Sequence, residues 1–386
     1  MKRHIFIGVV VLLLLSMVFA CTPQQTPSQV QIPKPVSSPT LAQTTVPTSN
    51  LPPLTSQDAA WNRIVEAAKK EGKLTIYSFN LVGDIGIVVS RAFKDTYGIT
   101  MDIVTGRGAE FTERVKTEKR IGNLVADVTE GNVSNIQNMK VEGLTTSYAS
   151  DLPVLREKDV WVADILSMDP QDKHVIVFSF TVYSPYVNNN LVKPGEEPTT
   201  WKDLLDPKWK SKMLLVEYTT SPGTIQQLAP LLREKVIDEE YLKSLYKQDL
   251  RFTTNLPEAA TLLARGERHL SIYASATFAR FVTDGAPIRA VELKDGTVLS
   301  VITMAPFQGG PHPNATKVFM NWFLSKEGQS VYSKAASGSP ARKDVPSSLP
   351  KASQIVPQRP IILTREDTDE AAKLYRDRWL NKLWGR

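Results

Sequence analysis

Cysteine is almost absent from this sequence, which holds one, Cys21, among 386 residues. A single thiol excludes an intramolecular disulfide framework. Histidine is scarce as well, and none of His174, His269 and His312 has a partner at the spacing of a zinc-binding pair. We therefore expect neither a structural metal site nor a cofactor.

Several sequence motifs of catalytic and nucleotide-binding sites are also missing. The sequence contains no GxSxG nucleophile elbow and no GxxxxGK[ST] phosphate loop, and the Gly-Arg-Gly turn at 106–108 lacks the third glycine of a dinucleotide-binding turn. Dense runs of Lys and Arg are lacking although the formal net charge is +6, so we expect no nucleic-acid partner. A Ser–His–Asp triad built from distant residues stays open, but nothing in the sequence points to one.

The clearest signal that is present lies at the N-terminus. Two basic residues precede a largely apolar run, 5–20, which is shorter than the ~20 residues of a membrane span. The run ends in VFAC at 18–21, which resembles a bacterial lipobox. The resemblance implies a lipoprotein signal peptide, 1–20, and lipidation of Cys21. We therefore expect an extracytoplasmic protein that is lipid-anchored to a membrane of the cell envelope.

A segment rich in proline, serine and threonine follows the cysteine. Residues 22–57 contain eight prolines, twelve serines or threonines, no glycine and one charged residue. Such a composition cannot bury a core. We interpret 21–57 as the lipidated cysteine and a tether that lets a folded domain stand off the membrane.

Beyond the tether, strand patterns alternate with helix patterns. The predicted strands are 73–78, 99–103 and 124–128. Their repetition with intervening helices predicts a parallel sheet with right-handed crossovers. Ligands bind outside the carboxyl ends of strands in such sheets. The corresponding strand ends are 78–80, 105–108 and 129–132.

An apolar, β-branched run within 174–190 leads into two tyrosines and predicts a crossing to a second lobe. That second half is also α/β, and Asp295-Gly296 between two apolar runs, 288–293 and 298–304, is a strong hairpin signal. The chain returns through 297–305, which gives a second crossing. The expected fold class is thus α/β with two lobes, each a mixed sheet flanked by helices, joined by two hinge crossings.

These patterns divide the chain into expected parts. They are lobe 1 (first part) at 58–176, lobe 2 at 177–300, the return to lobe 1 at 301–345, and a C-terminal tail at 346–386. A helix is predicted within the tail, over 366–384. Two lobes joined in this way leave a cleft, a preferred place for small ligands.

Polar and aromatic residues at the strand ends and crossings are the candidates for ligand binding. They are Ser78, Asn80, Arg107, Glu130, Tyr183, Tyr218 and Tyr273. Arg107 can hold a carboxylate or phosphate bidentately, or it is a solvated surface arginine. The Tyr183 phenol can bind an anion, stack on an organic ligand or bind a ferric ion, or it is a half-buried strand tyrosine. Ser78 and Asn80 also favour turns, and Glu130 alternatively interacts with the next helix.

Several stretches resemble the extracellular solute-binding proteins of ATP-binding-cassette (ABC) importers, in their ferric-iron-type branch. They follow the order of that family and lie at 59–78 (AAWNRIVEAAKKEGKLTIYS), 111–128, 199–213, 264–273, 312–329 and 339–345. The resemblance implies a type II periplasmic-binding-protein fold that closes on a small-molecule ligand. It also implies a membrane permease and its ATPase as partners, and we expect a monomer that performs no catalysis.

The ferric-binding members use a His after the first strand, a Glu near the position of Glu118 and two adjacent tyrosines. Here the first strand is followed by SFN at 78–80, and no Tyr-Tyr pair occurs. Of that set Glu118 and Tyr273 carry over, and Glu118 lies on a charged helix pattern that is typical of solvated carboxylates. We therefore expect a small anion or polar organic acid as the ligand, or iron in complexed form. A surface-anchored enzyme and a ligand sensor with the same cleft are the alternatives.

Overall fold

Strand β1 (Lys73–Ser78) is buried along nearly its whole length because strands pair with both of its edges. β2 (Thr100–Thr105) and β3 (Val128–Asn132) lie on either side of it, and both run parallel to it. The computed structural model describes residues 56–385 apart from 107, 218, 220–222 and 337. The expected signal peptide, Cys21 and most of the expected tether lie outside the described residues.

The first sheet is mixed, as the sequence predicted. Its strand order is β11-β4-β10-β3-β1-β2, and β12 pairs with β10. β10 runs antiparallel to both β3 and β4. The further strands of this sheet are β4 (Ile176–Tyr183), β10 (Thr297–Pro306), β11 (Ser339–Pro340) and β12 (Pro360–Ile362).

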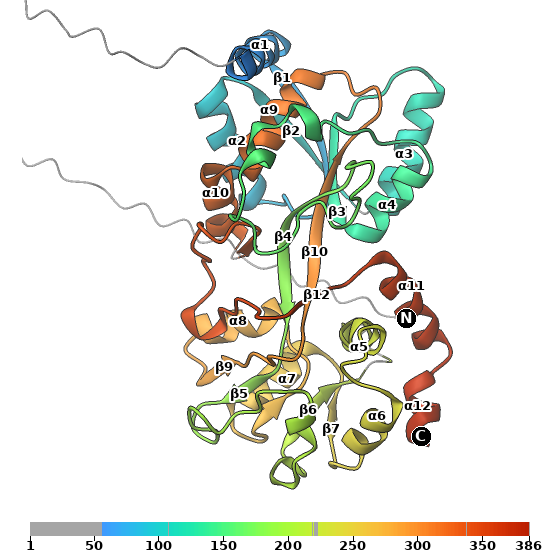
Figure 1. Ribbon diagram of the computed structural model, residues 1–386, viewed down its shortest axis with the longest axis vertical. Coiled ribbons are helices and arrows are strands. Elements are labelled where there is room, and N and C mark those ends of the chain that lie inside the picture. Colours follow the sequence, from blue (N-terminus) through green and yellow to red (C-terminus); the bar gives the residue numbers. More distant parts are fainter. Residues whose placement is uncertain (1–55, 107, 218, 220–222, 337, 386) are drawn as a thin grey trace, which may run out of the picture. The chain divides into compact units, whose positions relative to one another are not determined.

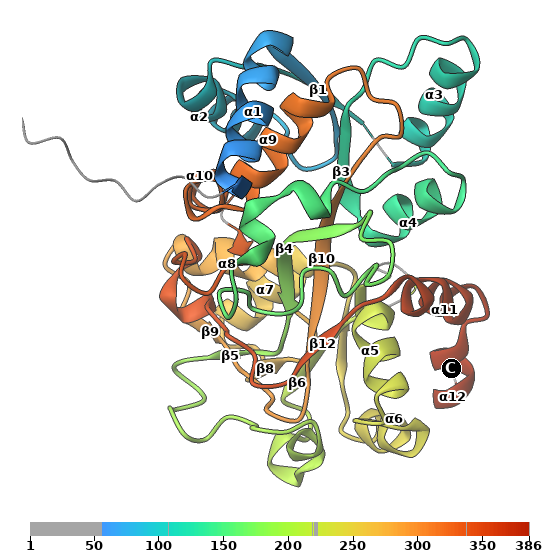
Figure 2. The ribbon, with the colours of Figure 1, turned by 45° about the horizontal axis from the view of Figure 1, so that its top comes forward.

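Helices surround this sheet and form lobe 1 with it (Figure 1). They are α1 (Ser56–Glu71), α2 (Asp84–Tyr97), α3 (Gly108–Arg120), α4 (Val133–Val141), α9 (Pro313–Leu324) and α10 (Lys326–Ala336). Figure 2 shows α1 and α9 side by side. The Glu71 carboxylate at the end of α1 accepts hydrogen bonds from the backbone of Asn314 and Ala315, so it satisfies free N–H groups in the first turn of α9.

The second sheet has the order β7-β6-β8-β5-β9 and forms lobe 2. Its strands are β5 (Tyr186–Asn188), β6 (Met213–Val216), β7 (Arg251–Thr253), β8 (Leu270–Ser271) and β9 (Ile288–Ala290). The helices that pack on it are α5 (Gly223–Arg233), α6 (Glu239–Tyr246), α7 (Leu256–Ala264) and α8 (Ala276–Thr283). Both sheets belong to one folded unit, residues 54–386.

Two long strands connect the lobes. β4 and β10 pair antiparallel, and Figure 1 shows both extending from the first sheet toward the second. Shortly after β4 the chain enters the second sheet at β5, and after β9 it returns through β10. Ligand-responsive movement of the lobes would have to bend these two strands.

The predicted third strand, 124–128, was wrong in its position. The observed strand β3 begins at Val128, where pairing with Ile76 of β1 starts. The residues before it form a connection because the buried Asp127 side chain accepts hydrogen bonds from the backbone of Thr75 and His312. Residues 129–132, which were predicted to follow the strand, therefore form most of it.

The predicted hairpin at Asp295-Gly296 was also wrong. The turn forms, since the Gly296 N–H donates to the Leu293 carbonyl at 3.1 Å, but the flanking strands join different sheets. β9 pairs with β5, whereas β10 pairs with β4 and β3. A turn motif in the sequence predicts that the chain reverses direction locally. It does not predict which strands the two flanking segments pair with.

The tail forms two helices in place of the single predicted one. They are α11 (Arg365–Arg376) and α12 (Trp379–Trp384), separated at Arg378, whose φ of 49° is left-handed. Figure 2 shows α11 beside α5, and α12 packs against α6, so the tail belongs to the core of lobe 2. Within the described residues, none of the helices is both long and apolar enough to cross a membrane.

Candidate functional site

The carboxyl ends of β1 and β3 meet at a buried carboxylate. Ser78 and Glu130 are register partners, and the Ser78 hydroxyl donates to the Glu130 carboxylate. Asn80 donates to it twice, from its backbone N–H and its side-chain amide, each at 2.6 Å, and the Leu81 N–H donates at 3.3 Å. We call Glu130 and residues 78–81 the Glu130 cradle.

The polar groups of the cradle satisfy one another's hydrogen-bonding capacity. A buried carboxylate needs several donors to compensate for lost hydration, and the turn after β1 supplies them. The Ser78 hydroxyl in addition accepts from the Leu81 N–H at 2.7 Å. The three predicted ligand contacts Ser78, Asn80 and Glu130 thus lie together, but their polar groups bind one another and hold the turn in place.

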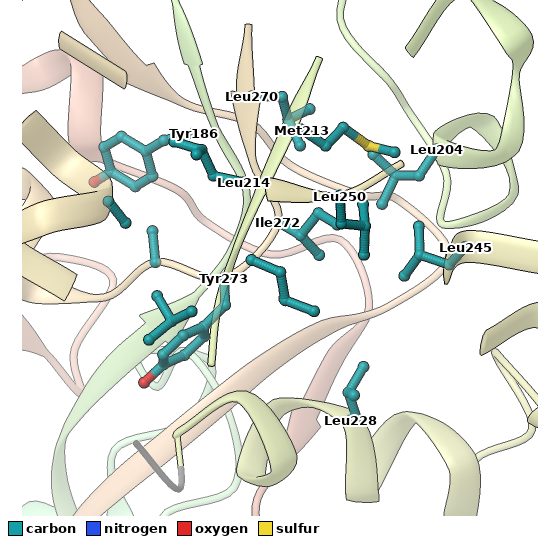
Figure 3. Packing of buried hydrophobic residues seen from close by; sticks show 14 of the residues in the cluster. Tyr186, Leu204, Met213, Leu214, Leu228, Leu245, Leu250, Leu270, Ile272 and Tyr273 are labelled. Carbon is teal, nitrogen blue, oxygen red and sulfur yellow. The ribbon is translucent and has the colours of Figure 1, made fainter. Parts of the chain in front are cut away.

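Tyr183 and Tyr273, far apart in the sequence, form a second cluster. Their ring centroids are 5.4 Å apart and the rings are nearly perpendicular, at 86°. Tyr183 is the last residue of β4, and Tyr273 follows β8. Figure 3 shows the Tyr273 ring at one side of the lobe 2 core, with its hydroxyl pointing away from Leu245 and Leu250. We call these residues the tyrosine pair.

Burial governs the acidity of the tyrosine pair. It raises the pKa of Tyr183, while hydrogen bonds with Ser300 and Tyr273 lower it. Burial also raises the pKa of Tyr273, and the neighbouring Tyr183 raises it further. Both phenols are therefore neutral at physiological pH.

The Tyr273 hydroxyl lies against the start of α5. A Cβ atom placed on Gly223 would overlap the Tyr273 hydroxyl oxygen, so the close approach requires glycine. Gly223 is the first residue of α5, whose free N–H groups create a positive potential. The neighbouring Thr224 hydroxyl donates to the Val216 carbonyl at 2.8 Å and ties α5 to the end of β6.

Glu118 is not the solvated carboxylate that its charged helix suggested. It is buried, and it accepts hydrogen bonds from the Tyr77 hydroxyl, from Arg114 Nε at 2.8 Å and from the Val125 N–H at 3.2 Å. Burial alone would raise the pKa of Glu118, but these hydrogen bonds outweigh burial and lower it. The helix pattern missed this because Tyr77, on β1, supplies a partner that helical spacing cannot reveal.

Two further candidates, Arg107 and Tyr218, lie outside the described residues. The structure does describe the two glycines that flank Arg107 in the sequence. The Gly106 N–H donates to the Ser78 carbonyl at 3.1 Å. A Cβ atom on Gly108 would overlap the Asn135 side chain of α4. Gly106 thus lies next to the end of β1.

Three residues near these clusters were not among the predicted ligand contacts. Ser300 was hidden within the apolar run of β10, although a polar residue in a crossing strand is a usable signal. Gly223 stands where a helix begins after a strand, which is a recurring place for close approach of a backbone. Phe79 lies inside the cradle turn, and its exposure, 53%, was not foreseeable from sequence.

Two α/β lobes joined by paired strands, with polar clusters at strand ends and at the hinge, define a two-lobed binding fold of type II. The chain belongs to the bacterial extracellular solute-binding protein family, whose model matches residues 125–359. Members of this family bind solutes outside the cytoplasm, as the family description states, and one relative is described as periplasmic.

Individual relatives are distant. A Haemophilus influenzae protein described as uncharacterized is 26% identical over 282 residues, which is 71% of this chain and 79% of that protein. A Salmonella typhi "putative 2-aminoethylphosphonate-binding periplasmic protein" is 24% identical over 266 residues, 66% of this chain and 73% of its own length. Among solved structures, a Bordetella ferric binding protein has a TM-score of 0.62 at 18% identity, and covers 81% of this chain and 98% of its own. This last similarity establishes the fold.

Proposed function

We propose that this chain is a lipid-anchored receptor for a small organic anion, which it delivers unchanged to an ABC importer. The observation that carries the proposal is the contact between Tyr183 and Tyr273 at the end of the hinge strand β4. Burial raises the pKa of both phenols and keeps them neutral, so each carries an O–H group that can donate. An anion is a strong acceptor for such donors.

The start of α5 supports the same ligand class. Gly223 places the first turn of this helix against the Tyr273 hydroxyl, so neutral donors and a positive helix end occur together. The Salmonella typhi relative is named for 2-aminoethylphosphonate, a small organic molecule with an anionic phosphonate group. Arg107 would add a bidentate partner for a carboxylate or phosphonate.

Iron in complexed form is the second candidate, and the tyrosine pair favours it, because two phenols in contact resemble a ferric ligand set. Glu118, the other residue that carries over from ferric-binding members, is already held by Tyr77 and Arg114. This engagement of Glu118 favours the organic anion.

Native mass spectrometry of the mature chain, purified without added ligand, tests the proposal. The expected result is a single adduct with the mass of an organic anion, released unchanged on denaturation. A ferric adduct, together with a visible phenolate-to-iron absorption band, would support the second candidate. A chemically altered product would support the enzyme alternative, and transfer of a signal to a membrane kinase in place of uptake would support a sensor.

The anchor has its own test. We expect Cys21 to carry acyl chains that hold the monomeric protein at the membrane, since several chains give stable anchoring where one is marginal. Replacement Cys21→Ser should move the protein from the membrane fraction to the soluble fraction and abolish incorporation of labelled fatty acid. A variant that stays membrane-bound would contradict lipidation.

A further inference from the structure

The turn that follows β1 has an unusual distribution of exposed groups. Its polar side chains, Ser78 and Asn80, are committed to Glu130, and Leu81 is buried. Its remaining apolar side chains are exposed, with 53% of Phe79 and 45% of Val82 accessible to solvent. The polar groups that a turn normally offers to water are thus replaced by an aromatic ring.

The backbone that carries this exposed ring is held in place. Phe79 lies between Ser78, whose carbonyl accepts from the Gly106 N–H, and Asn80, whose backbone N–H donates to Glu130 at 2.6 Å. Its neighbour across the sheet is Gly131 of β3, which follows the Ser78–Glu130 pair and has no side chain to cover the ring. The cradle thus fixes the backbone on both sides of a ring that the protein leaves uncovered.

More apolar surface continues along the chain. Ile87 and Val88, in the first turns of α2, are 56% and 44% exposed. Single exposed hydrophobic residues are common, but here four occur within ten residues that begin directly after β1. Four half-exposed side chains still fall well short of the ~800 Å² per partner that a stable protein interface buries. A small molecule is therefore a better match in size than a protein.

We infer that Phe79 is the lobe 1 contact for the hydrocarbon or aromatic portion of the ligand, so that the receptor takes an organic anion with an apolar body and not a bare inorganic ion. This inference rests on the proposed function. Ligands in α/β sheets bind outside the carboxyl ends of the strands, which is where Phe79 stands. Because the cradle already fixes the backbone that carries this ring, little backbone entropy is lost when a ligand covers it.

The tyrosine pair and the Glu130 cradle would then contact different parts of the ligand. The tyrosine pair and the start of α5 recognise the anionic head, and Phe79 with Val82 contacts the carbon skeleton. An inorganic phosphate or sulfate offers no surface that Phe79 can cover. Discrimination against inorganic anions thus comes from apolar contact and requires no repulsive group.

The test is titration calorimetry of the full mature chain with a panel of aliphatic and aromatic carboxylates and phosphonates, plus inorganic phosphate and sulfate. The panel includes 2-aminoethylphosphonate and phenylphosphonate. We expect Phe79→Ala to weaken binding of the organic anions at least tenfold and to change binding of the inorganic ions less than twofold. Phe79→Trp should retain the affinity and should show a ligand-dependent change in fluorescence.

Ile121→Ala is the matched control, because Ile121 is 66% exposed in the connection after α3 and lies outside the cradle. It should leave every affinity unchanged, and all variants should melt within a few degrees of the parent. Equal affinities of the parent and Phe79→Ala for organic anions would overturn the inference alone. Loss of uptake in cells with unchanged affinities would overturn it in favour of a protein-docking role. Absence of binding by every probe would overturn the proposed function as well.

Discussion

Tyr183 and Tyr273 meet edge to face, with ring centroids 5.4 Å apart, although 90 positions of the sequence separate them. Tyr183 ends the hinge strand β4, and Tyr273 belongs to lobe 2. The contact therefore couples a hinge strand to the lobe that it enters. A ligand that bound this pair would act on the hinge directly, which would link affinity to closure.

The first prediction concerns the Tyr183 hydroxyl. Tyr183→Phe keeps the ring contact with Tyr273 and removes the proton that we assign to the ligand, so affinity for the co-purified ligand should fall about tenfold, or about 1.4 kcal/mol. Tyr183→Ala should weaken binding further without unfolding either lobe. Tyr246→Phe is the control, because the Tyr246 ring stacks on Trp384 of the tail helix α12. Unchanged calorimetric affinity of Tyr183→Phe would mean that this tyrosine only packs.

The second prediction concerns the close approach at Gly223. Gly223→Ala places a methyl group on the Tyr273 hydroxyl, so the ring or the start of α5 must move. We expect a loss of about 1–3 kcal/mol in unfolding free energy, and weaker ligand binding. In Gly338→Ala, by comparison, the new methyl group would meet its neighbours at ordinary distances from 3.7 Å, and this variant should be tolerated. Chemical denaturation measures both, and equal stabilities would show that α5 has room to shift.

Local patterns in the sequence predicted the elements near the site but not their partners. β1 ended at Ser78 as expected, because its apolar alternation stops there. β3 was misplaced because Asp127, in the middle of the predicted strand, is held by Thr75 and His312 from elsewhere in the chain. The β9–β10 hairpin failed for the same reason, since strand pairing depends on contacts between residues distant in sequence.

The candidate site shows the same limit. Ser78, Asn80 and Glu130 were selected individually as strand-end residues, and the structure adds that they satisfy one another. The sequence contains no adjacent pair of tyrosines, yet the fold builds one from Tyr183 and Tyr273. Neither contact can be predicted from the spacing of residues along the sequence. Each contact depends on how the two sheets position β1, β3, β4 and β8.

The third prediction tests the Glu130 cradle. Glu130→Gln replaces one acceptor oxygen by an NH₂ group that faces donors, so we expect a loss of about 1–3 kcal/mol in unfolding free energy. Loosening of residues 78–81 should also weaken ligand binding through Phe79. Glu113→Gln, at a largely exposed position on α3, is the control and should change neither quantity. A fully stable Glu130→Gln protein would show that the turn holds its shape without the carboxylate.

The fourth prediction is a pH dependence that arises from Glu118. Hydrogen bonds from Tyr77, Arg114 and Val125 outweigh burial and lower its pKa in the folded state. A lowered pKa stabilises the fold above the unfolded-state value of about 4.3, and this contribution is lost as the pH falls through the folded-state pKa. Urea denaturation between pH 3 and 7 should show Glu118→Gln to be less stable near neutral pH, with a gentler decline on the acid side. Parallel curves for parent and variant would contradict this role.

The fifth prediction concerns the tail, in which the sequence predicted a helix over 366–384 and whose two helices pack in the core of lobe 2. Trp384 is buried, stacks on Tyr246 with ring centroids 5.1 Å apart, and donates from its indole N–H to the Leu242 carbonyl at 3.0 Å. Trp384→Ala should therefore cost about 3–5 kcal/mol of unfolding free energy. Trp379→Ala, at a partly exposed position, should cost clearly less. If both substitutions were equally mild, α12 would contribute little to the core of lobe 2, and ligand binding would survive removal of the helix.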